Sequence, residues 1–235
     1  MEVALQPSLF DSLGPADPPA GLPDSRADLG VRSGAGDEPC APALGPLGST
    51  VERVTLSGGA WVDVRPGWVS GSAEMFTRLV ERVPWEEERR VMYDRVVAVP
   101  RLLSWYGEHD AWPDPLLARA RDALNEHYAA DERERFVSAG MCFYRDGRDG
   151  VAWHGDRIGR SRREDVMVGI VSFGAPRALL LRPVGGGASL RYTLGHGDLL
   201  VMGGACQRTW EHSVPKTARA VGPRISVQLR PRGVA

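Results

Sequence analysis

The residues best suited to chemistry lie in the stretch D-G-V-A-W-H-G-D, residues 149–156, where a histidine and an aspartate stand two positions apart. If this stretch is a strand, His154 and Asp156 project from the same face, because side chains alternate across a strand. One imidazole and one carboxylate are two of the three ligands of the facial triad that holds non-haem Fe(II). The alternative is a solvated surface loop.

A third ligand has to come from a distant strand, and the chain contains five histidines. His127 falls on a predicted helix, His109 in a polar loop and His196 in a G-H-G-D turn. His212 follows a strand-like segment far downstream of Asp156, so we take it as the best candidate for the third ligand.

A second pattern lies near the C-terminus, in the segment R-I-S-V-Q-L-R, residues 224–230. Apolar residues alternate there with Arg224, Ser226, Gln228 and Arg230. On a solvated face this pattern would be ordinary. If the polar face turns into a barrel, two buried guanidinium groups require an anion. A dicarboxylate fits, because arginine binds carboxylates through paired hydrogen bonds.

The elements that must position these residues are short strands. Beyond residue 135 we expect no helix but a series of strands separated by Gly and Pro, which is typical of a sandwich or barrel. These strands are predicted at 136–144, 151–155, 165–173, 178–182, 189–194, 198–202, 209–214 and 224–230. Upstream, 51–56 and 60–65 alternate like half-buried strands, and 70–83 and 114–130 have the apolar spacing of amphipathic helices.

Domain organisation follows from a change in composition. Residues 1–50 are rich in Pro and Gly and lack periodic apolar residues, so we predict a flexible arm. Residues 51–235 are predicted to form one domain, with a supporting and lid segment at 51–134 and a β core at 135–235.

Composition also limits the partners and the compartment. The formal net charge is −1, so a nucleic-acid partner would need a local basic patch. The three cysteines are far apart and form no C-x-x-C pair, which indicates a reducing compartment. No apolar run is long enough for a membrane span and no signal peptide is evident. We expect a cytoplasmic monomer without membrane contact.

Several motifs in order resemble one family. Y-R-D-G-R-D-G-V-A-W-H-G-D, S-F-G-A-P-R, G-D-L-L-V-M-G-G, W-E-H-S-V-P-K and R-I-S-V-Q-L-R are similar to segments of the AlkB family of Fe(II)- and 2-oxoglutarate-dependent dioxygenases. V-P-R-L-L-S-W-Y-G, residues 99–107, resembles the segment ahead of that family's barrel. The resemblance spans roughly residues 51–232.

The resemblance implies a mostly β fold with flanking helices, in which a double-stranded β-helix (jelly-roll) core follows an N-terminal α/β lid and support segment. It implies that His154, Asp156 and His212 hold Fe(II), and that 2-oxoglutarate and O2 are consumed. Arg224 would grip the distal carboxylate of 2-oxoglutarate and Arg230 would lie at its other end.

Further cosubstrate contacts are implied at Tyr144, which matches a family tyrosine, and at Ser226 on the polar face of the last strand. Family members often carry Asn where this chain has Cys142. Because a thiol is a poor hydrogen-bond donor, that contact is lost or replaced here.

The implied activity is oxidative removal of alkyl groups from ring nitrogens of bases, as in 1-methyladenine and 3-methylcytosine in DNA. The target base has to leave the helical stack or come from a single strand. Trp105 and Tyr106 are candidates to stack on that base, and Trp210 shares a face with His212. A basic cluster after the metal motif includes Arg157 and Arg160, which would contact phosphate. Arg101 is a weaker candidate for the same role.

Three alternatives stay open from the sequence. In the first, the enzyme has the same chemistry but acts on RNA, protein or a small molecule. In the second, the protein is a non-catalytic binding module with a jelly-roll fold. The third is a zinc hydrolase, against which the arginine pair argues. Family members often place an acid soon after H-x-D, whereas Arg157 follows here, so base selectivity stays open.

Overall fold

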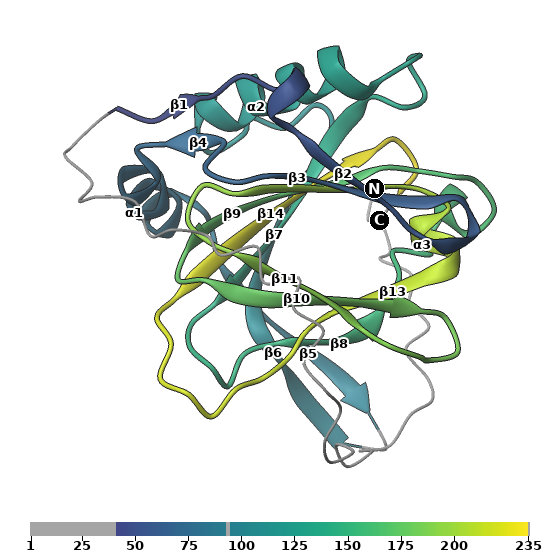
Figure 1. Ribbon diagram of the computed structural model, residues 1–235. Helices are drawn as coiled ribbons and strands as arrows, with labels where there is room; N and C mark the ends of the chain where they lie inside the picture. The colour runs from purple at the N-terminus through teal and green to yellow at the C-terminus, as the bar shows by residue number, and fades with distance from the viewer. Residues whose placement is uncertain (1–40, 93–94, 235) are drawn as a thin grey trace. The chain divides into compact units, whose positions relative to one another are not determined.

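The computed structural model describes residues 41–92 and 95–234, with side chains omitted for 90–97, and every structural statement below refers to these residues. Two antiparallel sheets dominate this part of the chain (Figure 1). The larger sheet has the strand order β2-β3-β12-β9-β14-β7-β6-β5, and the smaller has the order β11-β10-β13-β8. The non-consecutive neighbours in both sheets are those of a jelly roll.

The large sheet consists of β2 Glu52–Thr55, β3 Ala60–Arg65, β5 Glu86–Met92, β6 Arg95–Tyr106, β7 Phe136–Tyr144, β9 Val168–Gly174, β12 Leu199–Gly204 and β14 Arg224–Pro231. The small sheet consists of β8 Val151–His154, β10 Arg177–Pro183, β11 Leu190–Leu194 and β13 Trp210–Val214. A short pair joins β1 Ala43–Leu44 to β4 Val69–Ser70. The helices are α1 Ser72–Arg82, α2 Pro115–Tyr128 and α3 Cys206–Thr209, with single turns η1 Gly48–Thr50, η2 Ser57–Gly59 and η3 Arg160–Arg162.

One apolar cluster fills the space between the two sheets. Val62, Ile170 and Leu200 from the large sheet meet Leu181 and Val214 from the small sheet, and all five are buried. The eight strands predicted beyond residue 135 are all present, and each differs from its prediction by no more than a few residues at its ends. The predicted mostly β jelly-roll core is therefore confirmed.

A second cluster lies on the other face of the large sheet, which α1 and α2 cover (Figure 1). Helix α2 begins where Asp114 accepts a hydrogen bond from the Leu116 amide at 2.9 Å, and Pro115 occupies its first turn. Leu117 and Leu124 then face Val227 of β14 within this cluster. The helices thus pack against the apolar face of the strand that carries the two predicted cosubstrate arginines.

Three parts of the fold differ from the sequence prediction. Within the predicted flexible arm, β1 pairs with β4 and the Gly45 amide donates to the Trp68 carbonyl at 2.6 Å; residues 1–40 of that arm lie outside the described residues. Strands β5 and β6 form a hairpin that the sequence did not predict, and α3 is a short helix where none was expected. Within the described residues, no helix is long and apolar enough to cross a bilayer.

Candidate active site

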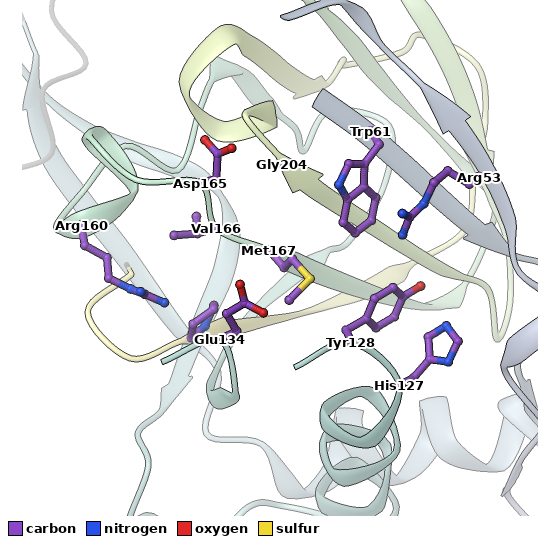
Figure 2. A pocket seen from close by; sticks show the side chains of 11 residues that line it. Arg53, Trp61, His127, Tyr128, Glu134, Arg160, Asp165, Val166, Met167 and Gly204 are labelled. Atoms are coloured by element: carbon purple, nitrogen blue, oxygen red, sulfur yellow. The ribbon is translucent and has the colours of Figure 1, made fainter. Parts of the chain in front are cut away.

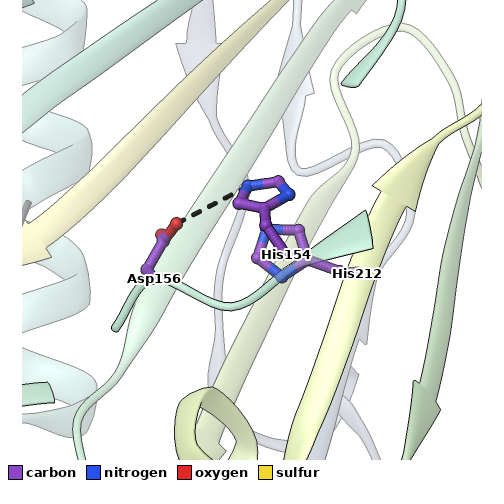
Figure 3. A group of neighbouring side chains, drawn as sticks. All are labelled: His154, Asp156 and His212. Carbon is purple, nitrogen blue, oxygen red and sulfur yellow. Dashed lines mark ion pairs between the residues drawn. The ribbon is translucent and has the colours of Figure 1, made fainter. Parts of the chain in front are cut away.

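Two neighbouring strands of the small sheet bring the histidines together. His212 on β13 pairs in register with His154 at the end of β8, and their ring centroids are 4.2 Å apart. With Asp156 they form a group whose potential ligand atoms all lie within 4.8 Å of one another (Figure 3). Two imidazole nitrogens and one carboxylate oxygen are the donor set that suits Fe(II), so these residues fit the predicted metal.

Asp156 reaches this group by a different route from the one predicted. Strand β8 ends at His154, and Asp156 lies in the turn that follows. Its Oδ1 is 3.7 Å from His154 Nε2, so the two side chains still converge. A turn, and not the predicted strand alternation, therefore orients the carboxylate.

The histidines are arranged to act as neutral ligands. His154 Nδ1 lies 2.9 Å from the Ala152 carbonyl oxygen, which can only accept, so Nδ1 carries the proton and Nε2 the lone pair. Burial lowers the pKa of His154, and it lowers the pKa of His212 to about 3, with His154 adding to the effect. Both rings are therefore neutral at physiological pH, as metal binding requires.

Arg230 fixes the carboxylate ligand from β14. Its Nε and Nη2 both lie 3.1 Å from Asp156 Oδ2, which leaves Oδ1 facing the histidines. Burial alone would raise the pKa of the Asp156 carboxyl, but Arg230 and the two histidines hold that pKa below its usual value. Asp156 is therefore ionised and ready to bind a cation.

Across the interior from the triad, Arg224 is buried with an unsatisfied donor. It is 1% exposed, its Nε donates to Ser172 Oγ at 2.8 Å, and its Nη1 is buried without a hydrogen-bond partner. The Tyr144 ring lies 5.4 Å away, and burial raises the pKa of Tyr144, so its hydroxyl keeps its proton. A buried guanidinium with an unpaired N–H requires an anion, and the distal carboxylate of 2-oxoglutarate meets that requirement.

Cys142 and Ser226 face each other between Arg224 and Arg230, because β14 and β7 pair in that register. Gln228 links them: the Cys142 thiol donates to Gln228 Oε1 at 3.7 Å, and Gln228 Nε2 donates to Ser226 Oγ at 2.7 Å. Sequence reasoning gave Gln228 no role at the site and missed Ser172. The alternation of residues 224–230 already placed Gln228 on the polar face, whereas nothing in the sequence distinguished Ser172.

Arg101 lies deeper in the site than predicted. Its Nη1 donates to the Gly150 carbonyl at 3.2 Å, and its buried Nε has no hydrogen-bond partner. Burial raises the pKa of Tyr144, and the charge of Arg101 opposes that rise. Burial lowers the pKa of His154, and the charge of Arg101 lowers it further. Arg101 is thus largely buried near Tyr144 and His154, and its predicted phosphate contact stays a prediction.

Trp105 and Tyr106 lie on opposite faces of β6. Trp105 is 49% exposed, and its ring centroid lies 5.7 Å from the guanidinium of Arg230. A Cβ at Gly140 would lie 3.3 Å from this ring and 2.5 Å from Arg230 Nη1, so only glycine leaves room for both. Tyr106 instead packs in the cluster beneath the helices, so its predicted role in base stacking is not supported.

Arg160 is held by structural contacts and does not project into solvent. Its Nε donates to the Arg232 carbonyl at 3.0 Å, its Nη1 to Glu164 at 3.3 Å, and its Nη2 to the Arg133 carbonyl. These contacts tie η3 to the C-terminal segment. The predicted phosphate role of Arg160 stays a prediction, and Arg162 and Arg163 beside it are exposed.

Arg157 and Trp210 are also held by the protein. Arg157 Nε donates to the Gln207 carbonyl at 3.1 Å, although its buried Nη2 has no partner. Trp210 is 7% exposed in the interior cluster, and its indole N–H donates to the Ser57 carbonyl at 3.2 Å. Trp210 therefore packs in the core, and its predicted substrate contact stays a prediction.

A separate cavity of about 380 Å³ lies between the C-terminal end of α2 and the outer face of the large sheet (Figure 2). Trp61 and Tyr128 stack there with ring centroids 6.1 Å apart, and Arg53 lies 3.9 Å above the Trp61 ring. Arg53 is paired with Asp63 at 2.7 Å, which also accepts from the Tyr128 hydroxyl. This cavity contains none of the metal ligands.

Comparisons with known proteins agree with this geometry. The model of the 2OG-Fe(II) oxygenase superfamily matches residues 69–230. Alpha-ketoglutarate-dependent dioxygenase alkB homolog 3 of Mus musculus is 31% identical over 213 residues, which cover 81% of this chain and 71% of that protein. The DNA oxidative demethylase ALKBH2 of Arabidopsis thaliana is 35% identical over 146 residues, covering 51% of this chain and 45% of that protein.

Among solved structures, a prolyl hydroxylase from Trichoplax adhaerens superposes with a TM-score of 0.53 at 12% identity, over 72% of this chain and 82% of that one. At this identity the likeness concerns the fold alone. Fold, ligand group and superfamily match together define the class, which is that of the Fe(II)- and 2-oxoglutarate-dependent dioxygenases. Within that class, the chain belongs to the AlkB family.

Proposed function

We propose that this enzyme removes alkyl groups from ring nitrogens of nucleobases in DNA, with 1-methyladenine and 3-methylcytosine as model substrates. The relatives support this proposal, because one of them is named as a DNA oxidative demethylase. The predicted cytoplasmic location and monomeric state belong to the same proposal.

The observation that carries the proposal is the position of Trp105. A half-exposed indole stands beside the guanidinium that holds the metal ligand Asp156. Stacking of a base on an aromatic side chain contributes about 1–3 kcal/mol per base. A base flipped out of the duplex, or one from a single strand, would lie on this ring within reach of the metal ligands.

Each part of the site then has a task. His154, Asp156 and His212 would hold Fe(II), and Arg224 would bind the distal carboxylate of 2-oxoglutarate. When bound, Fe(II) and 2-oxoglutarate supply O2 activation and hydroxylation of the alkyl carbon, after which the alkyl group leaves as an aldehyde. Arg230 keeps Asp156 oriented, and the buried Tyr144 stays protonated as a hydrogen-bond donor.

The test is formaldehyde release from single-stranded oligonucleotides containing 1-methyladenine or 3-methylcytosine, with unmethylated strands as the blank. We expect release that depends on 2-oxoglutarate and Fe(II) and that disappears in His154→Ala. Methylated RNA of the same sequence forms a second arm. Release from RNA alone would move the substrate to RNA, and no release from either nucleic acid would refute the proposal.

A further inference from the structure

The turn that carries the carboxylate ligand rests on the short helix α3. This helix connects β12 to β13 and is only four residues long (Figure 1). Its second residue, Gln207, is 1% exposed although its side chain is an amide. A buried amide has to satisfy its donors and acceptor inside the protein, so its partners show what it holds.

Gln207 forms hydrogen bonds with two successive residues of the turn that carries the ligand Asp156. Its side-chain Oε1 accepts a hydrogen bond from the Asp156 backbone amide at 3.0 Å. Its backbone carbonyl accepts from Arg157 Nε at 3.1 Å. Its Nε2 is directed to Met202 Sδ at 3.9 Å, which fixes the orientation of the amide. The turn and α3 are about fifty residues apart in sequence, yet Gln207 contacts two successive residues of the turn.

Gly155 permits this close approach. A Cβ at Gly155 would lie 2.8 Å from the Gln207 carbonyl oxygen and 3.0 Å from Arg157 Nε. The distance to the backbone oxygen is too short for a side chain and the distance to Arg157 is tight, so a larger residue at Gly155 would push the turn and α3 apart. The close approach at Gly155 and the two hydrogen bonds of Gln207 therefore belong to one contact between the turn and α3.

The two ends of Asp156 are thus held by different elements. Arg230 on β14 holds the carboxylate through Oδ2, and Gln207 on α3 holds the backbone amide. With both ends fixed, Oδ1 is held toward His154. Without the contact to Gln207, the Asp156 amide would lose its hydrogen-bond acceptor and Asp156 would be held by Arg230 alone.

We propose that Gln207 is a positioning residue for Asp156 and that it sets the affinity of the site for its metal without touching the metal. Partners that orient metal ligands typically change metal affinity by about 10–100-fold when they are removed. The inference rests on the metal group of His154, Asp156 and His212 and does not depend on the organic substrate.

The variant to compare with the wild type is Gln207→Met, which keeps the length of the side chain but removes the acceptor. Anaerobic titration with Fe(II), and with Mn(II) as a redox-inactive probe, should show binding about 10–100-fold weaker. Turnover of 2-oxoglutarate at saturating metal should recover toward the wild-type rate. Gln207→Glu retains an acceptor oxygen at the same reach and should bind metal more tightly than Gln207→Met.

Arg208→Ala is the matched control, because Arg208 follows Gln207 in α3 but pairs with Asp165 at the surface. Its metal affinity should equal that of the wild type. Equal losses in Arg208→Ala and Gln207→Met, or an unchanged affinity in Gln207→Met, would overturn the proposal. If Gln207→Met does not fold, Gly155→Ala tests the same contact from the turn side, and unchanged metal affinity there would overturn it as well.

Discussion

Arg224 shows how a single residue can favour binding at the expense of stability. Its guanidinium is buried with one donor unpaired, and burial lowers its pKa. In Arg224→Met we expect the affinity for 2-oxoglutarate to fall by about 2–5 kcal/mol, or at least roughly thirtyfold, because the bound carboxylate loses its partner. The ligand-free protein should unfold at the same or a higher temperature, because an uncompensated buried charge is removed.

Calorimetric titration of 2-oxoglutarate in the presence of Mn(II), together with thermal unfolding, measures both effects. Arg182→Met is the control, because Arg182 pairs with Glu211 on the small sheet at 3.1 Å, away from Arg224. An Arg224→Met protein that binds 2-oxoglutarate normally would contradict the assignment of Arg224 to the cosubstrate.

The two described cysteines should react differently with alkylating agents. Burial raises the pKa of the Cys206 thiol to about 12, so almost no thiolate is present at pH 8 and Cys206 should stay unmodified in the folded protein. Cys142 is only half-buried and lies opposite Ser226, between the two predicted cosubstrate arginines. Iodoacetamide should therefore label Cys142, and Mn(II) with 2-oxoglutarate should slow that labelling. Peptide mass spectrometry resolves the sites; fast labelling of Cys206, or no protection of Cys142, would contradict the placement.

Some functional residues are predictable from sequence because their types are rare and their spacing is informative. His154, Asp156, His212 and the Arg224/Arg230 pair belong to this group. Gln207 was missed for a physical reason, because the role of a glutamine depends entirely on which backbone group it meets in the folded protein. The same limit explains why the sequence did not predict the backbone contacts of Arg160, since its carbonyl partners come from distant segments.

At the scale of the elements, strand alternation along β6 predicts opposite phenotypes for two adjacent aromatic residues. Trp105→Ala should weaken binding of single-stranded methylated DNA by about 1–3 kcal/mol, because a base would lose its stacking partner. The unfolding temperature should change little, because half of the Trp105 side chain is already exposed. Tyr106→Ala should lower the free energy of unfolding by about 1–3 kcal/mol and leave metal affinity unchanged, because its ring packs beneath the helices. Fluorescence anisotropy and thermal unfolding would distinguish them; the reverse pattern would show that β6 is in the wrong register.

The elements that the sequence predicted share a property that the missed ones lack. Strands such as β7, β9 and β14 carry enough apolar residues to be recognised without their neighbours. Strand β5 reads E-E-E-R-R-V-M, which has no apolar alternation, and only its pairing with β6 makes it a strand. β1 has two residues and α3 has four, so neither is long enough to show a period.

At the scale of the whole molecule, ligands should stabilise the fold in two separable steps. A ligand that binds only the folded state adds about 2.7 kcal/mol at a hundred times its dissociation constant. Mn(II) should raise the unfolding temperature of metal-free protein, and 2-oxoglutarate should raise it further. His154→Ala should lose the first step, whereas Arg224→Met should keep the first and lose the second. Chelation by EDTA should reverse the metal step, and a 2-oxoglutarate shift of equal size without metal would contradict the shared site.

The contact between Arg230 and Asp156 has a thermodynamic consequence. Arg230 lies on the same strand face as Arg224, so the strand that binds the cosubstrate also holds a metal ligand in place. Two binding events that order the same pair of side chains are coupled, and coupling free energy is reciprocal. If Fe(II) increases the affinity for 2-oxoglutarate by some factor, 2-oxoglutarate must increase the affinity for Fe(II) by the same factor. The supply of cosubstrate would thereby govern how much of this enzyme carries iron.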